Sequence, residues 1–351
     1  MAFISIQPTD FFNTLLYAGD GSTNQAQTGV GFAPDMVWLK CTSGAESHVL
    51  GTTPQGGNAY LIPNSTAVEG SLTNYLQSFD ADGFTVGSGG FTGSGGSDYV
   101  SWNWKGGTTS GITTDGSTTI TPSAYSFNAD AGISILKYTG NTTSGAGLAH
   151  GMGKKPALFI AKDLGTTESW TVYHHSLGNT KFMTMNGTNA EGTATNRWND
   201  TDPTSVNMIL GSETSVNNTN MIGYCFAEVP GFSRFSCYKG NGDVNGSFIY
   251  TGFRPAWLVI KKYSGAGDGW YLVDNKSNPK NVVNKNLFVD TSGALSTAGS
   301  AASDKNMDFL SNGFKVRTTN GEVNQSNEQY IYMAFAEFPM VSSNSKPGVA
   351  R

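Results

Sequence analysis

Three copies of one ten-residue pattern constrain this chain more than any other feature of its sequence. Each copy begins with glycine, has proline three residues later, continues through a short apolar run, and ends on lysine six residues after the proline. The copies are Gly31–Lys40, Gly153–Lys162 and Gly252–Lys261. An apolar run rich in β-branched and aromatic residues and bounded by Gly and Pro is typical of a strand buried on both faces. We therefore expect three such strands, and internal repetition is the first property to explain.

The repetition extends on both sides of this pattern. A tyrosine followed by a glycine turn lies 17 or 18 residues before each proline, at Tyr17, Tyr138 and Tyr238. An aromatic segment closes each copy and ends at Trp104, Phe226 or Phe335, which lie 70, 70 and 80 residues after the proline. The chain is therefore interpreted as three copies of a module of roughly 100 residues, a length that can bury its own core.

Composition favours an all-β fold for these modules. Only 13% of the residues are charged, whereas 12% are aromatic and 45 are glycine, which argues against disorder. Short apolar runs alternate with polar turns, and Asp82-Gly83 and Asn312-Gly313 are hairpin-type dipeptides. We predict three tandem, mutually similar antiparallel β-sandwich modules of the jelly-roll type. A β-propeller is the main alternative, but three blades are too few for one.

The landmarks divide the chain into six segments. These are an N-terminal leader or anchor (1–16), β module 1 (17–106), a Gly/Thr/Ser-rich linker (107–132), β module 2 (133–231), β module 3 (232–340) and a polar tail (341–351). Thr119-Ile120-Thr121 within the linker is a candidate for an exchanged strand. Because module 3 follows module 2 almost without a linker, these two modules are expected to pack against each other.

Charge and hydropathy exclude several classes of protein. The net charge is −5 and no basic patch or tail is visible, so nucleic-acid binding is not expected. No apolar run reaches the 18 residues of a spanning helix, and no membrane insertion is expected. The N-terminus lacks the features of a secretory signal, so we expect synthesis in a cytoplasm and release, if any, by assembly or lysis. The three cysteines are interpreted as small buried side chains rather than a disulfide scaffold.

No strong catalytic or metal-binding motif is present. His174 and His175 are adjacent, and neighbouring residues of a strand point to opposite faces, so they do not suit one metal ion. Asp80-Ala81-Asp82-Gly83 begins like a calcium loop, but Phe91 occupies the place of the bidentate acid. We therefore predict no metal and no cofactor.

Two carboxylates and one tryptophan remain as candidates for chemistry or binding. Glu228 and Glu337 follow the closing segments of modules 2 and 3, and this recurrence favours a structural role over a glycosidase pair. We therefore predict that the chain is not an enzyme. Trp198 lies in a polar stretch without a repeat partner, and aromatic faces stack on sugar rings. Trp198 is the one predicted binding residue, as an exposed contact.

Six stretches of the chain have a recognisable combined pattern, namely residues 1–8, 10–14, 29–40, 79–87, 224–231 and 250–257. Together they resemble a repeat family of unknown function found in virion and tail-fibre-type proteins of marine and cyanobacterial tailed bacteriophages. The resemblance covers nearly the whole chain and supplies no catalytic residue.

The resemblance implies a structural component of a bacteriophage virion. We expect a tail fibre or receptor-binding protein for host attachment, or a capsid decoration protein, located in the virion. The expected partners are other virion proteins and a host-surface glycan. A homo-oligomer is expected, with a trimer favoured for fibres, although three modules in one chain can also close on one another. The alternatives are a polysaccharide depolymerase, of the tailspike-like glycosidase type, and a carbohydrate-binding lectin.

Overall fold

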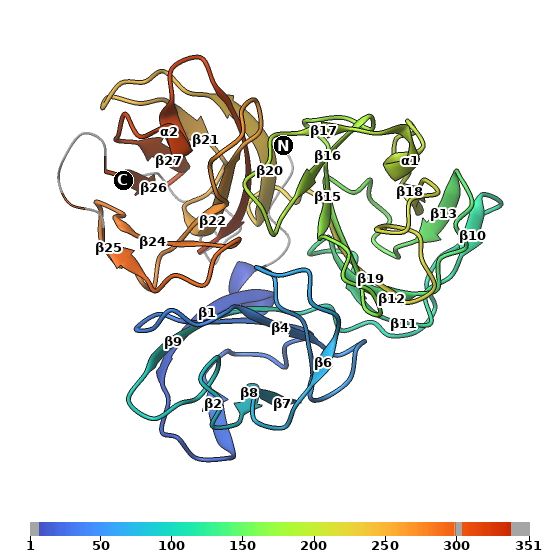
Figure 1. Cartoon of the computed structure of the whole chain (residues 1–351), viewed down its shortest axis with the longest axis horizontal. Helices are drawn as coiled ribbons and strands as arrows, with labels where there is room; N and C mark the ends of the chain where they lie inside the picture. The colour runs from blue at the N-terminus through green and yellow to red at the C-terminus, as the bar shows by residue number, and fades with distance from the viewer. Residues whose placement is uncertain (1–6, 298, 300–303, 338–351) are drawn as a thin grey trace, which may run out of the picture.

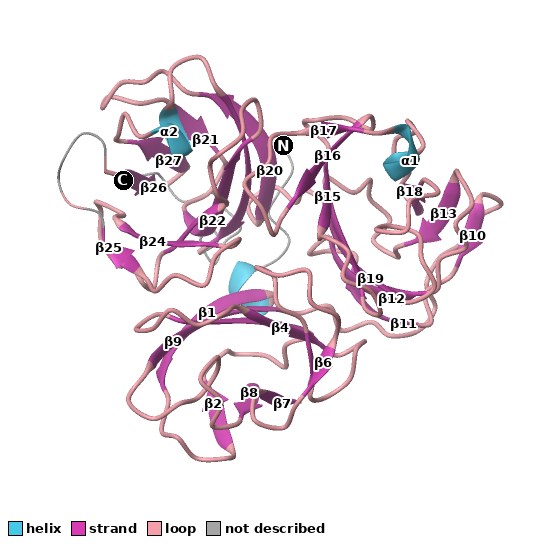
Figure 2. Cartoon of the chain, in the orientation of Figure 1, coloured by secondary structure: helices cyan, strands magenta, loops and turns pink. Residues whose placement is uncertain are grey.

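The computed structural model describes residues 7–297, 299 and 304–337, and in this part the chain is all-β, as predicted. Figure 1 shows three lobes around a common centre, the first in blue and cyan, the second mainly green and the third mainly orange and red. Helices in the described part are limited to single turns, and all other regular elements of the three lobes are β-strands (Figure 2).

The strands follow one another in three groups along the chain. The first lobe contains η1 (Pro8–Asp10), β1 (Phe12–Ala18), β2 (Gln25–Thr28), β3 (Met36–Cys41), β4 (Val49–Thr52), β5 (Ala59–Tyr60), β6 (Gly70–Ser71), β7 (Leu76–Asp80), β8 (Gly83–Val86) and β9 (Asp98–Trp104). The second contains β10 (Thr118–Ile120), β11 (Ala124–Asn128), β12 (Ile133–Tyr138), β13 (Ala146–Ala149), β14 (Leu158–Asp163), β15 (Thr171–His174), β16 (Lys181–Thr184), β17 (Gly192–Thr193), α1 (Thr195–Trp198), β18 (Asn207–Leu210) and β19 (Met221–Phe226). The third contains β20 (Ser233–Lys239), β21 (Phe248–Tyr250), β22 (Pro255–Lys262), β23 (Tyr271–Asp274), β24 (Lys285–Phe288), β25 (Ser296–Thr297), β26 (Met307–Leu310), β27 (Gly313–Val316), α2 (Gly321–Asn324) and β28 (Gln329–Ala336).

Each lobe has one larger sheet that faces the centre of the molecule. The strand orders are β1-β9-β3-β4, β11-β12-β19-β14-β15-β16-β17 and β20-β28-β22-β23-β24-β25. Three-stranded sheets lie behind them, in the orders β2-β8-β7, β10-β13-β18 and β21-β27-β26, and β5 pairs with β6. Pairing is antiparallel except between β10 and β13. That the lobes are copies of one module remains a prediction.

The strand after each repeated proline is buried on both faces, as expected. In β3, Met36 and Trp38 belong to a core at the centre of the molecule, whereas Val37 and Leu39 belong to the core inside the first lobe. The strands β14 and β22 alternate in the same way. Because successive side chains of a strand point to opposite faces, one strand helps to close two cores. This double role explains why the three runs are apolar at nearly every position.

The core at the centre joins all three lobes. The ring of Phe335 has its centroid 5.7 Å from that of Trp104 in the first lobe and 5.6 Å from that of Phe226 in the second. Within the third lobe it lies 5.8 Å from Trp257. A small cavity of about 30 Å³ remains at the centre, and apolar and aromatic side chains line it. The closing aromatic residues of the repeats therefore meet one another, which sequence spacing alone did not indicate.

Matching hydrogen bonds close the lobes into a ring. Backbone N–H groups donate across the three boundaries from Glu69 to Leu164, from Glu191 to Tyr263 and from Leu295 to Thr42, at 3.0, 3.0 and 2.9 Å. Side chains bond in the opposite sense, from Trp170 to Ser65 O, from Trp270 to Thr184 O and from His48 to Phe288 O, at 3.0, 2.9 and 3.0 Å. Each lobe thus uses one surface to contact the lobe before it and another to contact the lobe after it, a head-to-tail arrangement that closes.

Two of the predicted boundaries differ from the structure. Residues 12–16, assigned to the leader, form most of β1, which pairs along its length with β9. Phe12 and Thr14 are buried in this strand. The prediction placed the start of module 1 at the aromatic residue Tyr17 and so left these residues in the leader. The segment 107–132 is also more than a linker, because β11 pairs with β12 and β10 pairs with β13. A strand is present near Ile120, but it pairs with β13 inside the second lobe, so the exchange expected there is not seen. Residues 1–6 and 338–351 lie outside the described residues.

The lysines that end the three copies of the repeated sequence pattern are buried. The ammonium groups of Lys40 and Lys162 each donate to a carbonyl oxygen of the next residue, Cys41 and Asp163, at 2.6 Å. That of Lys261 donates to the carbonyl oxygen of Asp268. Burial lowers the pKa of each of the three lysines from its ordinary value to about 8.

We expect the stability of the protein to rise with pH between 8 and 9. The folded amines release protons near pH 8 and the unfolded ones near 10.5, so the unfolded chain binds more protons in this window. The free energy of unfolding should increase by about 1 kcal/mol per lysine. In urea titrations at both pH values, Lys162→Met should gain about one third less than the unmodified chain. Lys239→Met, at an exposed position, should behave like the unmodified chain, and an undiminished gain in Lys162→Met would contradict the assignment.

Candidate functional site

A polar cavity at the boundary between the second and third lobes is the best candidate for a binding site. It has a volume of about 240 Å³ and is here called the His175 pocket. Its polar lining consists of Lys154, Lys155, Tyr173, His175, Asp202 and Glu228. The small volume suits a compact ligand, because drug-sized ligands occupy pockets of roughly 300–1,000 Å³.

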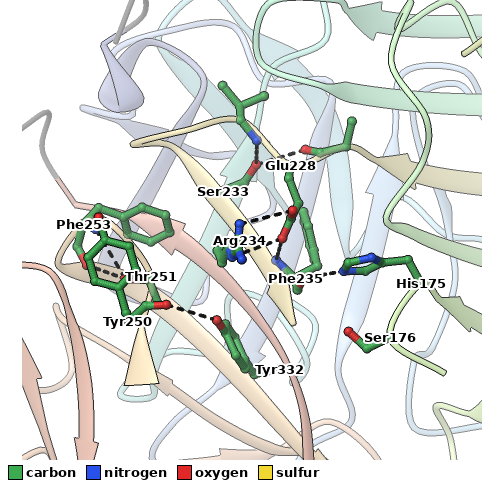
Figure 3. Close-up of polar contacts among 12 residues, drawn as sticks. His175, Ser176, Glu228, Ser233, Arg234, Phe235, Tyr250, Thr251, Phe253 and Tyr332 are labelled. Carbon is green, nitrogen blue, oxygen red and sulfur yellow. Dashed lines mark hydrogen bonds and ion pairs between the residues drawn. The ribbon is translucent and has the colours of Figure 1, made fainter. Parts of the chain in front are cut away.

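The end of β15 and the segment after β19 position the two central side chains of the pocket. His175 directly follows β15, and its Nε2 donates a hydrogen bond of 2.6 Å to the carbonyl oxygen of Phe235 in β20 (Figure 3). Because Nε2 carries the proton, Nδ1 is the acceptor in the neutral ring. No hydrogen bond to Nδ1 is formed by another described residue. The imidazole therefore offers a free acceptor beside the pocket.

Glu228 lies on the other side and is neutralised by an arginine from the next lobe. Its two carboxylate oxygens lie 3.3 Å from Nε and Nη1 of Arg234 in β20, and one of them also accepts the backbone N–H of Phe235 at 3.1 Å (Figure 3). Ser233 adds a further hydrogen bond between the two lobes, in which its hydroxyl donates to the carbonyl oxygen of Ala227 at 3.0 Å. These bonds attach the start of the third lobe to the end of the second, as the short connection between them predicts.

The remaining polar groups of the pocket carry both charges. Lys155 and Asp202 form an ion pair at 2.6 Å, and this hydrogen bond is the main cause that lowers the pKa of Asp202. Tyr173 is buried except at the pocket, and burial raises its pKa, so the hydroxyl stays protonated at neutral pH. Its hydroxyl forms no hydrogen bond with another described residue. Free donors and acceptors next to paired charges suit a neutral, hydroxyl-rich ligand.

The structure corrects the prediction for Trp198. Its side chain is fully buried, with its ring centroid 5.7 Å from that of Tyr173 and 6.0 Å from that of Phe159. Its indole N–H donates to the carbonyl oxygen of Lys181 at 2.9 Å. The exposure predicted for Trp198 is therefore wrong, because the polar residues around it form the outer side of the single-turn helix α1 while the ring points inward. The ring instead supports Tyr173 from behind the pocket.

The other sequence candidates have local structural partners. Glu337 forms an ion pair with Arg254, as Glu228 does with Arg234. Asp82 accepts the backbone N–H groups of Gly31 and Gly29 at 2.6 and 3.0 Å, which is a turn contact. Within the described residues, no group of three or more His, Cys, Asp or Glu side chains is placed to hold a metal ion. No helix in the described part of the chain is long and apolar enough to cross a membrane.

Sequence reasoning missed Tyr173, His175 and Asp202 as members of one pocket. They come from β15, from the turn after it and from the segment that follows α1. They meet because the segment after α1 returns to the end of β15, where Asp202 pairs with Lys155. The one local signal was the Lys154-Lys155-Pro156 sequence, where the other two copies have Ala33 or Arg254 before the proline.

Comparison with protein families gives one match. The model of a family described as a domain of unknown function (DUF7483) matches residues 7–339, nearly the whole chain. Neither the curated proteins nor the solved structures give a match.

Proposed function

We propose that this chain, which belongs to the DUF7483 family, is a non-enzymatic structural protein of a tailed-bacteriophage particle. Its role there is host attachment, as part of a tail fibre, or decoration of the capsid. The observation that carries the proposal is the closed ring of three lobes around one aromatic core. A single body held by one shared core suits a protein that works outside a cell. The phage-like sequence stretches support the same assignment.

The proposal includes a finer account of the fold. The three lobes are three copies of one antiparallel sandwich of the jelly-roll type, and the chain forms a threefold arrangement by itself. The common strand orders and the matching contacts at the three boundaries support this reading. A trimer of chains is then one way to extend this arrangement, rather than the source of the central core. Sedimentation equilibrium of the purified chain distinguishes a monomer from a trimer.

The location in a particle is tested on purified virions. Mass spectrometry of gradient-purified particles should identify peptides from all three lobes at a constant ratio to the major capsid protein. Gold-labelled antibodies to the chain should then decorate either the tail or the capsid in electron micrographs. Absence of the chain from purified particles would refute the proposal.

Host attachment further predicts that the His175 pocket binds a neutral sugar. The Tyr173 hydroxyl and the His175 Nδ1 support this expectation, because both are free to bond a ligand. The nearby carboxylate of Asp202 is already paired with Lys155. On a glycan array, His175→Ala combined with Tyr173→Phe should weaken binding at least tenfold, since each change removes one hydrogen bond to the ligand. The control is Tyr250→Phe, which alters an exposed hydroxyl in the third lobe. Equal binding by both variants would exclude this pocket, and release of reducing sugars by the unmodified chain would indicate a depolymerase instead.

A further inference from the structure

We propose that a groove along β1 binds an extended, acidic segment of a partner protein by strand addition. The groove lies at the boundary between the first and third lobes, away from the His175 pocket. The inference goes beyond the proposed function, because it holds whether or not the chain belongs to a virion.

The first step is the free edge of β1. This strand ends the sheet β1-β9-β3-β4, with β9 on its inner side. Gly19 donates to Ser97 O and accepts from the N–H of Gly96, so the odd-numbered residues before it direct their backbone groups towards β9. The N–H and C=O groups of Leu16 and Ala18 therefore point to the open edge. Neither residue has a backbone hydrogen bond there to another described residue.

The second step is the space beside this edge. One cavity of about 530 Å³ borders Leu16 and Ala18, and a second of about 210 Å³ borders Thr14. Lys276 lines both, so the two cavities follow β1 from end to end. In the second cavity, Thr14 Oγ1 and Asn275 Oδ1 are buried and have no hydrogen-bond partner among the described residues. Buried polar atoms are seldom left unpaired, so these two indicate that a polar ligand completes the groove.

The third step is the corresponding edge in the second lobe, which is occupied. The strand β12 has the place of β1, because Ile133 pairs with Phe226 as Phe12 pairs with Trp104. On its outer side β12 pairs antiparallel with β11, from Ala124 opposite Lys137 to Asn128 opposite Ile133. The second lobe thus carries an extended segment where the first has an open groove. Strand addition gives affinity through main-chain hydrogen bonds, and such a ligand fits an unpaired edge.

The fourth step is charge, which selects the partner. The segment 275–287 forms a wall of the groove and carries Lys276, Lys280 and Lys285 but no acidic residue. These three lysines are exposed, and none of them takes part in an ion pair within the described residues. Among the described residues, Asp98 is the carboxylate that lines the larger cavity, and Glu337 lines the smaller one but is paired with Arg254. The surplus of positive charge favours an acidic segment. The C-terminal residues 338–351 are a poor occupant, since they contain Lys346 and Arg351 and no acid.

The experiment uses the full chain and two fluorescent peptides. Both contain the β11 sequence Ser-Ala-Tyr-Ser-Phe-Asn-Ala, one followed by three aspartates and the other by three lysines. In fluorescence anisotropy titrations, the acidic peptide should bind at least tenfold more tightly than the basic one, and added salt should weaken it. Equal affinity for the two peptides, or no binding of either, would overturn the proposal.

Two variants locate the peptide. Leu16→Pro removes an N–H from the open edge and blocks an added strand, so affinity should fall at least tenfold. If that variant does not fold, the exposed triple variant Lys276→Ala, Lys280→Ala, Lys285→Ala provides the same test, with Lys315→Ala as the control of unchanged affinity. Binding that appears only after removal of 338–351 would assign the groove to the chain's own tail. Binding of alginate without binding of the acidic peptide would assign it to an anionic glycan; either result overturns the proposal.

Discussion

Replacing Phe335 by alanine should destabilise the whole protein by about 3–5 kcal/mol, the usual cost of removing a large buried aromatic side chain. The ring is 2% exposed and has aromatic neighbours in all three lobes, among them Phe12, Trp104 and Phe226. Phe335 lines the small central cavity, and loss of its ring would enlarge that cavity. Guanidinium unfolding followed by tryptophan fluorescence and by far-ultraviolet circular dichroism measures the loss.

The same experiment tests whether the ring of lobes unfolds as one body. Because all three larger sheets bury a face in the shared core, the two probes should report coincident transitions. Phe248→Ala is the matched control, since this phenylalanine is 46% exposed and its loss should change stability by no more than about 0.5 kcal/mol. A loss below 1 kcal/mol for Phe335→Ala would mean that the lobes are stable independently of the centre.

The repeated apolar runs allowed the most reliable part of the fold to be predicted from sequence. A strand buried on both faces was expected from residues 34–40, 156–162 and 255–261, and β3, β14 and β22 have this burial. Alternation and turn residues also indicated antiparallel pairing. These features depend on local chemistry, which a single sequence contains.

The arrangement of the lobes could not be predicted in the same way. Each module was expected to bury its own core, but Trp104, Trp257 and Phe335 meet in one shared core, because each larger sheet turns one face inward. That contact depends on residues more than 70 positions apart, and no local pattern encodes it. The error for Trp198 has the same origin: polar neighbours in sequence suggested exposure, whereas Phe159 and Tyr173 cover the ring in space.

The candidate site was beyond sequence reasoning for a related reason. His175 was considered only as half of a metal-binding pair with His174, whose ring centroid lies 5.3 Å from that of His175 and which bonds to the carbonyl oxygen of Tyr332. The residues that line the pocket all belong to the second lobe, but they come from separate segments of the chain. The predicted absence of a metal and of enzymatic activity remain predictions.

Acid should destabilise the ring of lobes through two buried histidines. His48 accepts the indole N–H of Trp38 on Nδ1 and donates from Nε2 to Phe288 O, across the boundary between the first and third lobes. His174 accepts the N–H of Ser176 and donates to the carbonyl oxygen of Tyr332, across the boundary between the second and third. Both rings must be neutral to accept on Nδ1. Burial is the main cause that lowers the pKa of each histidine to about 3.

The direction of the effect follows from these pKa values. In the unfolded chain the histidines titrate near 6.5, so between pH 6.5 and 3 the unfolded state binds more protons than the folded state. The stability that the neutral rings provide is complete above pH 6.5 and is lost as the pH falls. At pH 4.5 each histidine should cost about 2–3 kcal/mol relative to pH 7. His150 adds a similar cost at pH 4.5, since burial lowers its pKa to about 4, still below that pH.

The double variant His48→Gln, His174→Gln separates this effect from the titration of carboxylates. A glutamine amide can accept one hydrogen bond and donate another without gaining charge, so both contacts across the lobes are conserved in kind. Thermal unfolding between pH 7 and 4.5 should show a much shallower loss of stability in the variant than in the unmodified chain. His175→Gln is the control, because it changes an exposed ring that also bonds to the third lobe. If the double variant loses stability as steeply as the unmodified chain, the acid sensitivity does not come from the boundaries between the lobes.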